Sequence, residues 1–91
     1  MAASRPGSEI AAVLVLFPED GETIRRLADD CEHFRETCEH LALARETLAA
    51  FEARPDGQAR RETEDYRLII AEFEQDIAGL IAAARTAGRR A

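Results

Sequence analysis

The most regular feature of the chain is an apolar stripe between residues 24 and 48. Its members follow one another at alternating steps of three and four residues, which is an a/d heptad register: Ile24, Leu27, Cys31, Phe34, Cys38, Leu41, Arg45 and Leu48. Neither proline nor glycine interrupts residues 22–53, and Glu19, Asp20 and Glu22 supply the negative charge that a helix N-terminus favours. The pattern predicts one long helix over 22–53 that buries this stripe.

A second stripe of the same kind runs from residue 63 to residue 84, through Thr63, Tyr66, Ile70, Phe73, Ile77, Leu80 and Ala84. The segment RPDGQ lies between the two stripes and combines a proline with Asp-Gly, the strongest turn signal in the chain. We therefore predict a turn over 54–57, a second helix over 58–86, and an antiparallel hairpin of the two helices.

One charged residue, Arg45, occupies a stripe position in the first helix. Folding the hairpin at the predicted turn places Arg45 opposite Tyr66 and within reach of Glu62 or Asp65. A charge at the edge of a helical seam often fixes the register of the helices at some cost in stability. We expect Arg45 to have this role.

The N-terminal part of the chain holds a continuous apolar run, residues 10–17, which ends before Pro18. Its periodicity does not separate a strand from a short helix. The β-branched Val13 and Val15 favour a strand, but a lone strand would lack a pairing partner, so a helix is favoured narrowly. Residues 1–8 are expected to form a flexible leader and 89–91 a tail, with one helical domain over 9–88.

The apolar surface exceeds what one hairpin can bury, because several large apolar residues lie beside the seam: Leu43, Phe51, Ile69 and Ile81. Such surfaces usually mark an interface. We predict an all-α protein in which two hairpins dimerise into a four-helix bundle, with the N-terminal segments packed across it. A monomeric three-helix fold, with segment 10–17 laid against its own hairpin, is the alternative.

Composition narrows the choice of partner and compartment. The chain carries 18 acidic residues against 12 basic ones, all of them arginine, for a formal net charge of −6, so a nucleic-acid partner is not expected. The apolar run is far shorter than the roughly 20 residues that span a bilayer, and it lacks a cleavage pattern for export. Two cysteines at helical spacing suit a reducing bacterial cytoplasm better than a disulfide framework.

The repeat Cys-Glu-His, at residues 31–33 and 38–40, raises the question of a metal site. On a continuous helix, the cysteines point inward and the histidines outward, and His33 and His40 lie about 10.5 Å apart, too far for a shared ion. Four outward residues nevertheless form a ligand-rich stripe: Asp29, His33, Glu36 and His40. Two of them could bind one ion if another subunit supplied the remaining ligands. A solvated charged face is favoured, and no cofactor is expected.

No catalytic constellation is apparent, because the only serines are Ser4 and Ser8 and no glycine-rich loop is present. The pattern favours a non-enzymatic oligomerisation or protein-interaction module, such as an adaptor, regulator or assembly subunit, that binds itself and another protein. Two alternatives stay open. One is a metal-binding bundle that uses the outer stripe across subunits, and the other is a thiol redox sensor in which Cys31 or Cys38 pairs between subunits.

Overall fold

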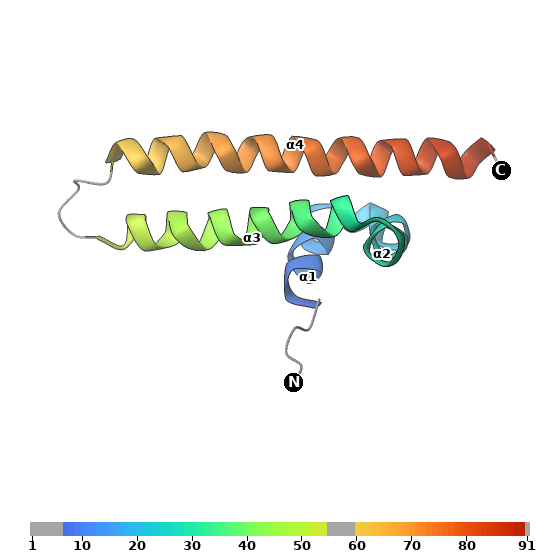
Figure 1. Ribbon diagram of the computed structural model, residues 1–91, viewed down its shortest axis with the longest axis horizontal. Coiled ribbons are helices and arrows are strands. Elements are labelled where there is room, and N and C mark those ends of the chain that lie inside the picture. The colour runs from blue at the N-terminus through green and yellow to red at the C-terminus, as the bar shows by residue number, and fades with distance from the viewer. Residues whose placement is uncertain (1–6, 55–59, 91) are drawn as a thin grey trace.

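Every secondary-structure element is a helix within residues 7–54 and 60–90, the part of the chain that the computed structural model describes (Figure 1). The elements in chain order are α1 (Gly7–Leu16), the short 3-10 helix η1 (Pro18–Asp20), α2 (Gly21–Asp30), α3 (Glu32–Glu52) and α4 (Arg60–Arg90). Helices α3 and α4 lie side by side and antiparallel, so the all-α fold and the helical hairpin are confirmed.

The apolar run is helical over residues 10–16, which belong to α1, and its last residue, Phe17, follows the helix; α1 also includes residues 7 and 8 of the expected leader. The helix ends before Pro18, because a proline has no N–H to continue the ladder; the last such bond runs from the Phe17 N–H to the Val13 carbonyl oxygen at 3.0 Å. Figure 1 shows α1 running across the hairpin, not along it. Val13 and Ile10 are buried, and α1 packs on α2 and α3 of its own chain.

The prediction of one continuous helix over 22–53 is wrong, because the chain breaks at Cys31. This residue has an extended backbone (φ −125°, ψ 105°) between α2 and α3. Arg35 Nη1 donates to the carbonyl oxygens of Ala28 at 2.7 Å and Asp29 at 3.3 Å, which satisfies the end of α2. The Cys31 thiol accepts from the Phe34 N–H at 3.4 Å and caps the start of α3. Three of the groups that the break leaves without an intrahelical partner therefore find local ones.

The break turns α2 out of the line of α3 and brings it against the C-terminal part of α4 (Figure 1). Ile24 is fully buried there, and Leu27 packs beside it against the core. An ion pair between Arg85 Nη1 and Asp20 Oδ1, 3.2 Å apart, joins α4 to η1. The N-terminal third of the chain thus contacts both helices of the hairpin.

All four helices contribute to a single core, whose buried members are Ile10, Val13, Ile24, Phe34, Cys38, Leu41, Ile77 and Ile81. Burying a side chain of this size stabilises the fold by about 1.5–3 kcal/mol relative to leaving it exposed. The remaining stripe residues predicted as core or interface are half-buried: Leu27, Cys31, Leu48, Tyr66, Ile70, Phe73 and Leu80.

Arg45 is exposed, so the prediction that it lies at a buried edge is wrong. The ion pair that joins the two helices of the hairpin is instead made by Arg67 Nη2 and Glu52 Oε2, 2.8 Å apart. Both side chains are largely exposed, and such pairs contribute about 0–1 kcal/mol. Tyr66, the expected neighbour of Arg45, packs its ring against Phe51.

Helix α4 differs in its bounds from the predicted 58–86, since it continues to Arg90 and includes two residues of the expected tail. Most of the predicted turn lies in residues 55–59, outside the described part of the chain. At 31 residues α4 is about 46 Å long, so the hairpin extends well beyond α1 and α2 (Figure 1). None of the described helices combines the length and apolar character needed to span a membrane.

Candidate protein-interaction surface

A shallow groove runs between α3 and α4, and neither α1 nor α2 contributes to its lining. We define the hairpin groove by its seven lining residues: His40, Leu43, Ala44, Thr47, Tyr66, Ile69 and Phe73. Two of the large apolar side chains that the structure leaves exposed, Leu43 at 62% and Ile69 at 36%, lie together in this groove. The volume of the groove is about 220 Å³. Small-molecule pockets usually measure about 300–1,000 Å³, so the hairpin groove is better suited to side chains of another protein.

Aromatic contacts across the hairpin hold the two walls of this groove together. The rings of His40 and Phe73 lie 5.8 Å apart between centroids, and those of Phe51 and Tyr66 lie 5.6 Å apart. The Thr47 hydroxyl donates to the Leu43 carbonyl oxygen at 2.9 Å, so its donor is satisfied within α3. The floor is therefore mainly apolar, with the His40 imidazole and the Tyr66 hydroxyl as its polar groups.

Acidic residues border the hairpin groove on both helices. Residues three or four positions apart are neighbours on a helix surface. Seven acids stand at such positions relative to the lining residues, and we call them the acidic rim: Glu36, Glu39, Glu46, Glu62, Asp65, Glu72 and Asp76. All seven are exposed, and no arginine stands at these positions. Acidic residues therefore predominate at the helix positions next to the lining, while Arg54 lies near one end of the groove, over the ring of Phe51 that packs on Tyr66.

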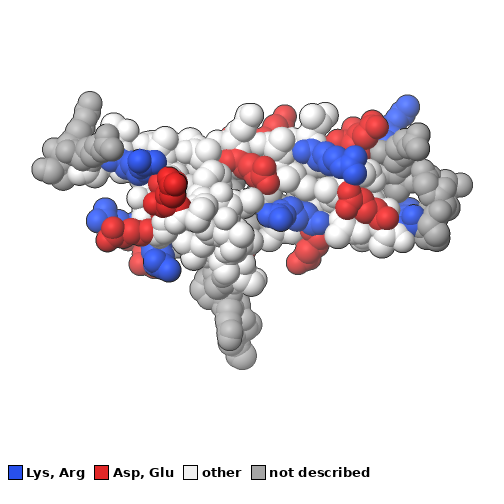
Figure 2. Space-filling view, turned by 180° about the vertical axis from the view of Figure 1, so that it is seen from behind, with Lys and Arg blue, Asp and Glu red and all other residues white. Residues whose placement is uncertain are grey.

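The opposite side of the molecule from the view of Figure 1 carries charges of both signs (Figure 2). Arginines and acids alternate there over a largely uncharged surface. The ion pairs Arg67–Glu52 and Arg85–Asp20 show that positive side chains have acidic neighbours elsewhere on the protein. The helix positions next to the hairpin groove thus carry acids without arginines, whereas the face shown in Figure 2 carries both.

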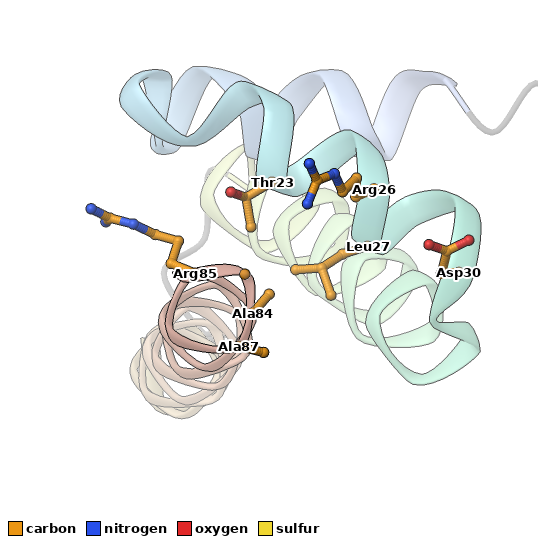
Figure 3. A pocket seen from close by; sticks show the side chains of 8 residues that line it. Thr23, Arg26, Leu27, Asp30, Ala84, Arg85 and Ala87 are labelled. Atoms are coloured by element: carbon orange, nitrogen blue, oxygen red, sulfur yellow. The ribbon is translucent and has the colours of Figure 1, made fainter. Parts of the chain in front are cut away.

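A second hollow, of about 600 Å³, lies between α2 and the end of α4 (Figure 3). Its charged lining residues are Arg26, Asp30 and Arg85. In Figure 3 Arg85 extends away from the two residues on α2, and its guanidinium pairs with Asp20. Because these polar groups do not converge on one point, the hollow has no arrangement suited to a charged ligand.

The two cysteines occupy different environments. Cys31 is half-buried at the start of α3, where its sulfur accepts a hydrogen bond, whereas Cys38 is fully buried in the core. Burial, together with the nearby carboxylates of Glu9 and Glu39, raises the pKa of Cys38 to about 12. The thiolate is the nucleophilic form, so Cys38 is unreactive at neutral pH.

The ligand-rich stripe of Asp29, His33, Glu36 and His40 is interrupted in the structure. Asp29 lies on α2, before the break at Cys31, while the other three lie on α3. Within residues 7–54 and 60–90, no three His, Cys, Asp or Glu side chains come together as a metal site would require. His40 instead packs against Phe73, so any metal bound by this stripe would need ligands from a second chain.

No protein-family model, no curated protein and no solved structure matches this chain. The candidate surface is therefore argued from its own geometry.

Leu43 and Ile69 stand out in the sequence as apolar residues beside the seam. The sequence analysis did not place His40 and Thr47 in the lining of the groove. The signal that could have found them is their spacing, since His40, Leu43 and Thr47 follow at steps of three and four on one side of the stripe.

Proposed function

We propose that this protein is a non-enzymatic interaction module that docks a helix of another polypeptide in the hairpin groove. The observation that carries the proposal is the exposure of Leu43 and Ile69 in an apolar groove between two long helices. A third or fourth helix laid in such a groove is the usual way in which helical hairpins complete a bundle.

The chemistry of the described residues also favours binding over catalysis. The more deeply buried thiol, Cys38, is held protonated, and the two histidines are exposed on α3, where no three potential metal ligands come together among the described residues. The hairpin groove offers apolar contact surface and few polar groups, which suits an adaptor, a regulator or an assembly subunit.

A homodimer is the simplest assembly of this kind. Two hairpins that meet through their grooves would form a four-helix bundle and cover Leu43 and Ile69 in both copies. Because α1 lies across its own hairpin, the N-terminal segments in this dimer stay with their own chains.

Sedimentation velocity over a range of protein concentrations tests this assembly. If the groove joins two copies of the chain, the wild type should associate and Leu43→Glu should shift toward the monomer, since the variant places a charge in the apolar contact. Leu68→Glu is the matched control. Leu68 is 67% exposed and stands nine residues before the buried Ile77, on the opposite side of α4 from the core. A wild type that stays monomeric at every concentration, or equal effects of the two variants, would contradict the homodimer.

A further inference from the structure

We infer that the preferred occupant of the hairpin groove is a cationic amphipathic helix of another protein, with an apolar stripe flanked by arginine or lysine. This inference rests on the docking function proposed above and names the chemistry of the partner. It follows from the combination of an apolar floor with the acidic rim, and from the geometry of the two helices that form the groove.

The apolar lining of the groove is complementary to a helix with an apolar stripe. The lining residues extend from His40 to Thr47 on α3 and from Tyr66 to Phe73 on α4, eight residues on each helix. The seven steps between the ends of such a segment correspond to about 10 Å, or two turns. A docked helix that runs along the groove therefore places apolar side chains at positions i, i+3 or i+4, and i+7 over Leu43 and Ile69.

The acidic rim determines the charge that flanks this stripe. Its seven exposed carboxylates stand three or four positions from lining residues on both helices, and no arginine occupies these positions. Residues on either side of a docked helix's apolar stripe face these carboxylates. Opposite charges at such positions speed association and select the partner, whereas like charges across an interface cost several kcal/mol.

A second copy of the chain is a poorer occupant for the same reason. In a symmetric dimer the same patch is used by both subunits, so the acidic rim of one copy faces the acidic rim of the other. Salt screens repulsion between exposed charges, so a homodimer through the groove should strengthen as salt is added. A complex with a cationic helix should weaken under the same change.

Fluorescence anisotropy with two synthetic helical peptides tests the inference. Each peptide has about 18 residues, long enough for a helix to form on docking, and both carry the same leucine stripe. One has lysine and arginine beside the stripe, and the other has glutamate at the same positions. We expect the cationic peptide to bind wild-type protein at least about tenfold more tightly, with affinity that falls as salt rises from about 0.05 to 0.5 M.

Matched variants show whether binding uses the groove and its rim. Leu43→Glu should abolish binding of the cationic peptide if the apolar floor anchors it, and Leu68→Glu should leave binding unchanged. The double change Glu62→Gln with Glu72→Gln removes two charges of the acidic rim and should weaken binding several-fold. Its control, Glu64→Gln with Glu74→Gln, removes two glutamates at the same spacing on the same helix that do not border the groove. This control should change the affinity little.

The outcomes separate this inference from the proposed function. Equal binding of both peptides, sensitive to Leu43→Glu, would retain docking in the groove and overturn the charge preference. Equal effects of the two glutamine pairs would also overturn the preference. If neither peptide binds and the protein forms a dimer that Leu43→Glu disrupts, the occupant is a second copy and the inference fails. If neither peptide binds and the protein is monomeric, the inference and the docking function fail together.

Discussion

The thiol of Cys31 accepts a hydrogen bond from the backbone N–H of Phe34, three residues later, at a distance of 3.4 Å. This contact satisfies one of the unpaired amides at the start of α3 and marks Cys31 as the N-cap of that helix. Together with the Arg35 contacts to the end of α2, it fixes the point where the chain changes direction.

Two substitutions at this position test the cap. We expect Cys31→Ser to be more stable than Cys31→Ala by about 1 kcal/mol, because a serine hydroxyl caps a helix and an alanine methyl does not. Chemical denaturation of both variants measures the difference. In a continuous helix the order would reverse, since alanine has the higher helix propensity. An alanine variant more stable than the serine variant would therefore contradict the break at Cys31.

The two thiols should differ in reactivity toward a disulfide reagent at neutral pH. We expect one thiol per native chain, Cys31, to react readily, while Cys38 reacts only after unfolding because it is buried and its pKa is raised to about 12. The Cys31→Ala and Cys38→Ala variants assign the two phases. Rapid reaction of Cys38 in the native Cys31→Ala variant would mean that the core opens far more often than its packing indicates.

The raised pKa of Cys38 also predicts a loss of stability in alkaline solution. The thiol ionises near its ordinary pKa of 9.0 when the chain is unfolded, but stays protonated to about 12 when it is folded. The unfolded state therefore releases a proton first as the pH rises. The free energy of unfolding should be unaffected below pH 9 and should fall above it, by at most about 1.4 kcal/mol per pH unit.

The Cys38→Ala variant provides the comparison for this effect. It is expected to be less stable at neutral pH, because a buried side chain is shortened, but its stability should decline less steeply above pH 9. Every other titratable group is present in both proteins, so the difference between their slopes isolates Cys38. Parallel stability curves for the two proteins above pH 9 would show that the thiol is not desolvated as described.

Substitutions of two valines that lie two residues apart in α1 test the packing of this helix on its own hairpin. Val13 is 0% exposed and Val15 is 78% exposed. We expect Val13→Ala to lower the free energy of unfolding by about 2 kcal/mol, because it removes two buried methyl groups. Val15→Ala should change it by less than about 0.5 kcal/mol. Equal, small effects would show that α1 does not contribute to the core.

Periodicity in the sequence was enough to predict the hairpin, because the stripe residues Phe34, Leu41 and Ile77 are buried at its seam. The break at Cys31 was not predictable in the same way, since no proline or glycine marks it. It is held by tertiary contacts, in particular Arg35 with the Ala28 and Asp29 carbonyls, that propensity does not encode. The exposure of Arg45 was not predicted, because a heptad pattern assigns the same burial to every stripe position. In the structure α1 and α2 cover only part of the hairpin.

The candidate surface was predictable in its chemistry but not in its location. Leu43 and Ile69 were recognised as apolar residues beside the seam, and the acidic character of the chain follows from composition. Which residues border the same groove depends on the rotation of α3 and α4 about their axes. Contacts such as His40 with Phe73 set that rotation, and only the folded structure shows them.

The position of α1 and α2 over one half of a long hairpin divides the molecule into regions of unequal local stability. Near Phe34 and Ile77 an amide is released only by opening of the whole core, whereas near Phe51 and Tyr66 two helices alone protect it. Hydrogen exchange should therefore be fastest in the half of the hairpin nearest residues 55–59. The hairpin groove reaches into that half, so a docked helix would reveal itself as slower exchange around Thr47 and Tyr66, without any label on the partner.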